Sequence, residues 1–234
     1  CSGYHDSENS VIGFSHTHLS GTGCGDLFDV TLMPVIGEVT YGRGRLGDYS
    51  TGFWSEADRT QEVVEPGYYS VPLTRYNILA EMTATERGGL HRYTFPASDE
   101  AAIILDLVHG GCFDRPEDLF AEAVSDTRVV GRRHSWGWSN NQKVYFVIEF
   151  SKPFDKFEPI GENGFYYRIH VRTEEGEQIG VKVALSSTSP AGAELNFSTE
   201  VKDKDFDTVR KETRAKWQNE LRKIRIYGAT EEQN

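Results

Sequence analysis

The segment QKVYFVIEFSKPF, residues 142–154, is the clearest strand in the chain and decides the fold class. Its side chains alternate between two faces. Tyr145, Val147 and Glu149 lie on one face. The other face carries only apolar side chains, namely Val144, Phe146, Ile148 and Phe150. An alternation with a period of two residues predicts a β-strand rather than a helix.

Similar segments precede and follow this strand, separated by Gly, Pro and acidic turn signals. Strands are expected at 28–36, 66–73, 76–85, 89–96, 101–109, 121–139, 142–154, 164–171 and 179–189, with loops at 37–48 and 110–118. Short strands at this spacing predict a mostly β protein folded as an antiparallel β-sandwich.

The periodicity changes near the C-terminus. Residues 205–224 place Phe206, Val209, Trp217, Leu221 and Ile224 on one helical face, and Asp203 or Asp205 can cap the start. We therefore expect a C-terminal linker helix, with a β domain over residues 1–200 and the linker over 201–234.

Composition excludes several functional classes. The formal net charge is −11 and the pI is about 5.1, which disfavours nucleic acid and anionic membrane surfaces as partners. No apolar run is long enough to span a membrane, and the run AAIILDLV (101–108) contains an aspartate. Three cysteines, Cys1, Cys24 and Cys112, do not make a disulfide framework.

The run VIGFSHTHLSGTGCGDLFDVTLMP, residues 11–34, places two histidines in a Gly/Ser/Thr-rich loop before a strand that ends near Pro34. In an extended segment, His16 and His18 project to the same side. The loop is either a binding site presented by a rigid scaffold or a well hydrogen-bonded turn. A zinc site would need further ligands, because H-x-H supplies only two.

Other candidate residues also allow two interpretations. The cluster Trp136-Gly137-Trp138 with Asn140, Asn141 and Gln142 could stack on sugars and bind hydroxyl groups, or fill the core and close a turn. His109 could face a cleft at a sheet end, or be held by backbone groups. His91, His134 and His170 are expected on the surface or in strands, and Cys24 is expected to be packed and inert. Asp26, Asp29 and Asp106 are expected to be solvated or turn-capping, so no catalytic pair is named.

Several motifs together resemble a known family. GFSHTHLSGTGCGD (13–26), preceded by CSGYH (1–5), is similar to the N-terminal domain of glycoside hydrolase family 92, whose members are calcium-dependent exo-acting α-mannosidases. HGGCFDRPED, GRRHSWGWSNNQKVYFVIEFSKPF, VALSSTSPAGAELNF and the final helix resemble the same family in the same order.

The resemblance implies a β-sandwich of the supersandwich kind that lacks its first strands, with a linker helix leading to an (α/α)6 catalytic barrel absent from this sequence. That barrel would hold the catalytic acid, the base and the calcium ion, so no catalytic or metal-binding residue is assigned here. The implied activity is removal of terminal mannose from glycans, including N-glycans, with inversion. This chain would contribute substrate-binding positions, namely Gly3, Tyr4, His16, His18, Ser20 and Cys24, with Cys1, Ser2 and His5 beside them.

The implied partners are mannose-containing glycans and the C-terminal domain of the same protein. The implied location is the periplasm or the extracellular space, with a lipid anchor on the full-length protein as one option. Two alternatives stay open. One is a stand-alone carbohydrate-binding module without catalysis. The other is a metal-dependent enzyme complete within this chain, with the metal on His16 and His18.

Overall fold

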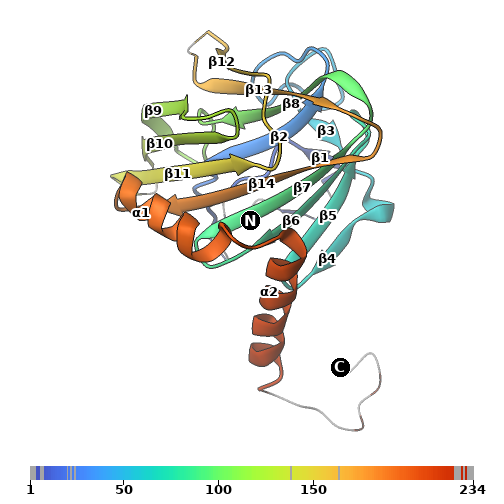
Figure 1. Cartoon of the computed structure of the whole chain (residues 1–234), viewed down its shortest axis with the longest axis vertical. Helices are drawn as coiled ribbons and strands as arrows, with labels where there is room; N and C mark the ends of the chain where they lie inside the picture. Colours follow the sequence, from blue (N-terminus) through green and yellow to red (C-terminus); the bar gives the residue numbers. More distant parts are fainter. Residues whose placement is uncertain are drawn as a thin grey trace.

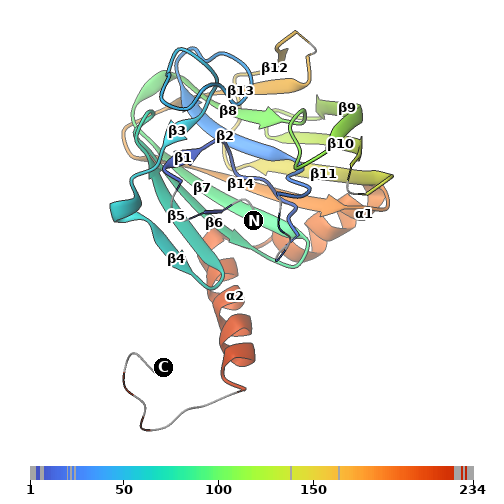
Figure 2. The ribbon, with the colours of Figure 1, turned by 180° about the vertical axis from the view of Figure 1, so that it is seen from behind.

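Two antiparallel sheets face each other in the computed structural model, which describes residues 4–5, 8–19, 21, 23, 25–137, 139–162, 164–223, 228 and 230 (Figures 1 and 2). The larger sheet has the order β4 (Val63–Glu65), β5 (Tyr68–Leu73), β6 (Ile78–Ala84), β7 (Gly88–Phe95), β14 (Glu177–Ser186), β11 (Gln142–Phe150), β10 (Arg128–Trp136) and β9 (Arg115–Ala123). The smaller sheet has the order β12 (Lys156–Ile160), β13 (Tyr166–Thr173), β8 (Ser98–Asp106) and β2 (Thr31–Ile36). A short pair, β1 (Ser10–Val11) and β3 (Ser55–Glu56), and a 3₁₀ turn (Arg59–Gln61) complete the described strands and loops. The predicted antiparallel sandwich is confirmed.

The main core lies between the two sheets. On β11, the apolar face predicted from the sequence points into this core, and Phe146 and Ile148 are at most 1% exposed. On β8, Ala101 to Leu105 are fully buried. A strand buried on both faces lacks polar alternation, which explains the continuous apolar run AAIIL.

A second, smaller core covers the outer face of the larger sheet. It is made by α1 (Pro190–Asn196), by the π-helical turn Phe197–Val201 and by α2 (Phe206–Leu221). Ala193, Phe197, Val201 and Val209 pack there against Leu90, Val147 and Ala184. Helix α1 was not predicted from the sequence. Its start is nevertheless well specified, because the Ser189 hydroxyl accepts from the Gly192 N–H and proline occupies the first turn.

Helix α2 confirms the predicted C-terminal helix, and Asp205 is its cap, with its carboxylate accepting from the Thr208 N–H at 2.7 Å. Only part of the predicted apolar face of α2 is buried. Phe206 and Val209 pack on the sheet, but Trp217 is 50% exposed and Leu221 is 61% exposed. Figure 1 shows the reason, since the distal half of α2 leads away from the sheets. Ile224 lies outside the described residues.

Three predicted strand boundaries were wrong. The single strand expected over 121–139 is a hairpin, because residues 124–127 turn between β9 and β10. The loop expected over 110–118 ends earlier, at the start of β9. The strand expected from residue 28 begins at Thr31, because Phe28 and Val30 have positive φ angles. Pro34 lies inside β2, where it is tolerated because β2 is an edge strand.

Two further expectations concern membrane spans and the cysteines. None of the helices within the described ranges is long and apolar enough to cross a membrane. Cys112 is a free, exposed thiol, whereas Cys1 and Cys24 lie outside the described residues.

Candidate functional site

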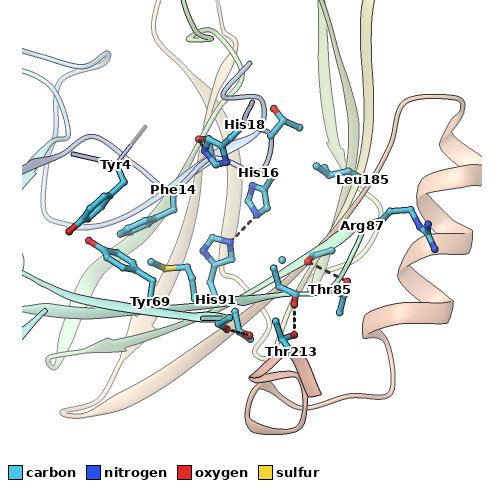
Figure 3. A pocket seen from close by; sticks show the side chains of 18 of the residues that line it. Tyr4, Phe14, His16, His18, Tyr69, Thr85, Arg87, His91, Leu185 and Thr213 are labelled. Atoms are coloured by element: carbon cyan, nitrogen blue, oxygen red, sulfur yellow. Dashed lines mark hydrogen bonds between the residues drawn. The ribbon is translucent and has the colours of Figure 1, made fainter. Parts of the chain in front are cut away.

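An open groove of about 1290 Å³ lies between the N-terminal loop and one end of the larger sheet (Figure 3). One side is formed by residues 10–18, and the other by β4 to β7 and the β6–β7 turn. Leu195 of α1 and Trp217 of α2 also line it. The lining combines aromatic rings, such as those of Tyr4 and Tyr69, with hydroxyl groups, such as those of Ser15 and Thr85.

The histidine-bearing loop is fixed to the chain segment that follows it. Phe14 and Leu32 exchange backbone hydrogen bonds of 2.8 and 3.1 Å, and the Phe28 N–H donates to the Thr17 carbonyl at 2.9 Å. Positive φ angles at Leu27, Phe28 and Val30 bend the chain back between these contacts. Residues 14–17 are therefore held beside residues 28–32, as a binding loop on a rigid scaffold requires.

His16 belongs to a chain of four polar groups that crosses from the loop to the sheet. Its Nδ1 lies against the Val30 carbonyl, and its Nε2 is 2.9 Å from Nε2 of His91 on β7. Nδ1 of His91 is 2.7 Å from the Tyr93 hydroxyl. Figure 3 shows the two imidazoles meeting at the edge of the groove.

Only one arrangement of protons satisfies the whole chain when both rings are neutral. A carbonyl can only accept, so Nδ1 of His16 donates to Val30 and its Nε2 is left as an acceptor. His91 then donates from Nε2, and its Nδ1 accepts from Tyr93. A second proton on His16 would place two N–H groups against each other, and a second proton on His91 would require the Tyr93 hydroxyl to accept instead of donate.

Burial favours this neutral state. Desolvation lowers the pKa of His16 to about 4, partly opposed by the Val30 hydrogen bond. Desolvation also lowers the pKa of His91 well below its ordinary value, because its side chain is only 4% exposed. Both imidazoles are therefore uncharged near neutral pH and present no positive charge to the groove.

His18 lines the groove but has different partners from His16. One of its ring nitrogens is 2.8 Å from the Ser15 hydroxyl, and its ring meets Phe28 edge-on with centroids 5.4 Å apart. Desolvation lowers the pKa of His18, against the opposing effect of Asp29. The two histidines thus share the groove without sharing a ligand set.

Tyr4 forms the aromatic end of the groove. Its ring contacts Tyr69 edge-on at 6.0 Å and lies under the Arg59 guanidinium at 5.3 Å. Its hydroxyl donates to Glu62 at 3.3 Å. The other predicted binding residues, Gly3, Ser20 and Cys24, lie outside the described residues, as do Cys1, Ser2 and Trp138.

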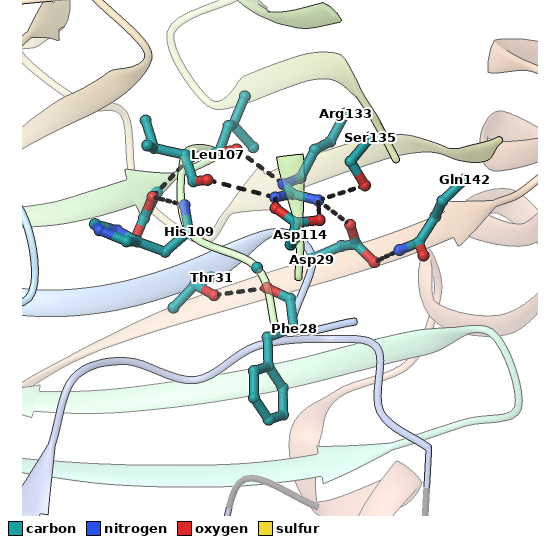
Figure 4. Close-up of polar contacts among 12 residues, drawn as sticks. Phe28, Asp29, Thr31, Leu107, His109, Asp114, Arg133, Ser135 and Gln142 are labelled. Carbon is teal, nitrogen blue, oxygen red and sulfur yellow. Dashed lines mark hydrogen bonds and ion pairs between the residues drawn. The ribbon is translucent and has the colours of Figure 1, made fainter. Parts of the chain in front are cut away.

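A second polar cluster holds the histidine-bearing loop from behind (Figure 4). Its centre is Arg133, a fully buried guanidinium that donates to Asp29 at 2.6 Å and also pairs with Asp114. It donates further to the Leu107 carbonyl at 2.8 Å and to the Ser135 hydroxyl at 3.1 Å. One guanidinium therefore ties two loops to β10.

The three singled-out aspartates are not solvated. Asp29 is fully buried, accepts from Thr17 at 2.6 Å and from Gln142, and forms the Arg133 ion pair, so the expected solvated or capping role was wrong for it. Asp106 is buried too, but it caps a turn as expected, because it accepts from the N–H groups of Val108 and His109. Asp26 is 1% exposed.

His109 has side-chain partners rather than the backbone partners that were considered. Its Nδ1 is 2.8 Å from Asp106 and 3.3 Å from the Tyr166 hydroxyl. Gln142, offered as a sugar-binding carboxamide, is engaged by Asp29. Trp136 is 39% exposed and does not fill the core.

Sequence reasoning missed the importance of His91 and Arg133. His91 was expected on the surface or in a strand. It lies in β7 but is buried, since Tyr93 and Phe95 on the same face point into the core. Arg133 and Ser135 are buried at alternate positions of β10. The two-residue period of the strand is the sequence signal that could have placed Arg133 on the inward face.

Three carboxylates line the groove among the described residues. Glu65 pairs with Arg210 at 3.3 Å and Glu86 with Lys216 at 2.6 Å, whereas Glu8 is exposed, and we assign no catalytic pair to them. Within the described part of the chain, no three His, Cys, Asp or Glu side chains are grouped so that they could hold a metal ion. The described residues therefore do not fit a calcium site.

Family models match almost the entire chain. The model of the glycosyl hydrolase family 92 N-terminal domain matches residues 1–204, and that of the family 92 catalytic domain matches residues 192–234. No curated protein matches significantly.

Solved structures agree with the family models. The family GH92 α-mannosidase BT3965 from Bacteroides thetaiotaomicron is 30% identical, with a TM-score of 0.87 over 97% of this chain and 33% of that chain. The family GH92 glycosyl hydrolase ccman5 is 25% identical, with a TM-score of 0.82 over 98% of this chain and 33% of that chain. The inverting mannosidase BT2199 from B. thetaiotaomicron shares the fold, with 22% identity and a TM-score of 0.77 over 98% of this chain and 31% of that chain. The chain thus spans about one third of the length of these relatives, and it belongs to glycosyl hydrolase family 92.

Proposed function

We propose that the protein to which this chain belongs is an exo-acting α-mannosidase that removes terminal mannose from glycans with inversion. The observation that carries the proposal is the match of residues 1–204 to the family 92 N-terminal domain, together with 30% identity to an α-mannosidase over 97% of the chain. The BT3965 enzyme has also been solved with mannoimidazole bound.

In this proposal, residues 1–200 form the N-terminal domain, and residues 201–234 lead to a catalytic domain. The start of the catalytic-domain match at residue 192 supports that division. An inverting reaction needs one carboxylic acid to protonate the leaving oxygen and one carboxylate to activate water. We assign both groups, and the calcium ion, to the catalytic domain.

The role that we assign to this chain is recognition of the terminal sugar by the groove. Hydroxyl groups of the groove and the His18 imidazole can exchange hydrogen bonds with sugar hydroxyls, whereas the ring nitrogens of His16 and His91 are already paired. Tyr4 and Tyr69 offer ring surfaces for sugar C–H groups. Because His16 and His91 are uncharged, and Arg59 and Arg87 of the groove are paired with Glu62 and Glu200, the groove suits a neutral polyol better than an anionic ligand. An export route to the periplasm or the cell exterior, where mannose-rich glycans occur, is part of the same proposal.

The test is release of free mannose from α-mannobiosides by the full-length protein, with and without a calcium chelator. We expect activity that chelation abolishes, and a His18→Ala variant with at least a tenfold lower kcat/KM. His170→Ala is the matched control, because that histidine lies on β13, away from the groove, and pairs with Glu158 at 2.6 Å.

Unchanged kinetics in His18→Ala would refute the assigned role of the groove. Binding of mannosides without any mannose release by the full-length protein would favour a carbohydrate-binding module instead. Mannose release by residues 1–234 alone would show that the acid and the base lie in this chain.

A further inference from the structure

Phe113 is the most exposed large apolar side chain of the described residues, with 75% of its surface open to solvent. It follows β8 in the loop 110–114, and its φ of 63° is left-handed. A bulky residue in that conformation is rare and costs about 1–2 kcal/mol. The backbone of Phe113 is therefore strained, and its exposed ring buries little surface that would offset this strain.

The loop that carries Phe113 is rigid. The Gly111 N–H donates to Leu27 at 2.8 Å, and the Cys112 N–H donates to Gly25 at 2.6 Å. A Cβ atom at Gly111 would lie 2.4 Å from the Gly25 carbonyl oxygen, so only glycine fits. Asp114, the next residue after Phe113, is held by the buried Arg133. The ring is therefore presented by a fixed backbone.

A second exposed aromatic ring lies beside this loop. Trp136, at the end of β10, is 39% exposed and carries the Arg115 guanidinium 5.3 Å from its ring centroid. The next residue, Gly137, packs against the Phe113 backbone, because a Cβ built there would be 3.2 Å from the Phe113 carbonyl oxygen. The backbone segments that carry the two rings thus lie side by side, and we call Phe113, Arg115 and Trp136 together the aromatic rim.

The surroundings of the aromatic rim are polar rather than aliphatic. Cys112, Ser139 and Asn140 are exposed and adjacent to it in sequence, and the other exposed large apolar side chains among the described residues belong to other segments. A protein-docking face would be a contiguous apolar patch. Flat rings among hydrogen-bonding groups instead suit a pyranose ring, which has C–H faces and hydroxyl edges.

Residues 25–28 contact both the loop of Phe113 and the groove. Residues 25–27 bind the loop of Phe113, and Phe28, the next residue, contacts His18. We propose that the aromatic rim is a second carbohydrate-contact surface, which binds the sugar units that follow the terminal mannose of a longer glycan. This inference rests on the proposed function of the groove.

The test compares Phe113→Ala and Trp136→Ala with the wild type in the full-length protein, on p-nitrophenyl α-mannoside and on a mannotetraose. We expect KM for the tetrasaccharide to rise five- to tenfold, while the constants for the aryl mannoside stay within twofold. Phe113→Tyr keeps the ring and should keep the wild-type KM. Val124→Ala is the matched control, because Val124 is 52% exposed in the turn at the other end of the same hairpin.

Equal KM values on the tetrasaccharide in wild type and Phe113→Ala would overturn the inference. A parallel loss on both substrates, with a lower Tm, would also overturn it and would indicate a contact between domains. Calorimetric titration of mannotetraose into the same variants separates this inference from the proposed activity. If the wild type releases no mannose but binds the tetrasaccharide, weaker binding by Phe113→Ala still supports the aromatic rim, and equal binding refutes it.

Discussion

The neutral pair His16–His91 predicts that the chain loses stability in mild acid. Desolvation lowers the pKa of His16 from 6.5 to about 4 in the folded state. The unfolded chain therefore takes up a proton as the pH falls below 6.5, whereas the folded chain resists until about 4. Stability is fully present above the unfolded pKa and is lost as the pH falls through this window.

The magnitude follows from the size of the shift. One pKa unit corresponds to about 1.4 kcal/mol, so His16 alone removes about 2 kcal/mol from the free energy of unfolding between pH 8 and pH 5. The lowered pKa of His91 acts in the same direction. The double variant His16→Asn, His91→Gln replaces both imidazoles by amides that do not titrate in this range.

The assay is urea unfolding of the chain at pH 8 and at pH 5, followed by circular dichroism. The wild type should lose at least about 2 kcal/mol more than the double variant over this interval. His5→Gln is the control for the loss of an exposed histidine that is not part of the His16–His91 chain. An equal loss in wild type and double variant would refute the neutral, buried state of the pair.

Two further predictions concern the anchors of the domain. Arg133→Met leaves two buried carboxylates, Asp29 and Asp114, without their counterion and should cost about 3–5 kcal/mol in urea unfolding. The neighbouring Arg132→Met removes only a half-exposed pair and should cost less than about 1 kcal/mol. Equal losses of unfolding free energy in the two variants would show that the buried ion pairs of Arg133 stabilise the fold no more than the exposed pair of Arg132. Asp205→Ala removes the N-cap of α2 and should lower the Tm, whereas Asp205→Asn should lower the Tm less, as thermal unfolding would show. An Asn variant as unstable as the Ala variant would contradict the cap.

Some of the architecture could be predicted from local pattern alone. The alternation in residues 142–150 fixed both the strand and its buried face, because neighbouring side chains on a strand point to opposite sides. The hairpin turn at 124–127 was missed although Ser125, Asp126 and Thr127 are turn formers. The apolar residues before and after it gave the appearance of one continuous strand.

The candidate site was predicted only in part. Tyr4, His16 and His18 do line the groove, and the motif that contains the two histidines was recognisable from the sequence. His16 is hydrogen-bonded to His91, a partner that no local pattern indicates, and the binding of substrate by His16 and His18 stays a prediction. The exposure of Phe113 had no sequence signal, because a loop residue's accessibility depends on which other loops pack on it.

The sequence by itself determined the antiparallel sandwich, the capped C-terminal helix and the family, because each depends on local periodicity or on a contiguous motif. Only the tertiary structure decided which polar groups meet. His16 and His91 are 75 residues apart, and Arg133 and Asp29 are 104 apart. Such partners are chosen by the pairing of β7 and β10 with their neighbours and by the burial that follows. That burial turns two ordinary histidines into a neutral pair and an ordinary arginine into the anchor of two loops, since desolvation and ion pairing arise only where the folded chain excludes water.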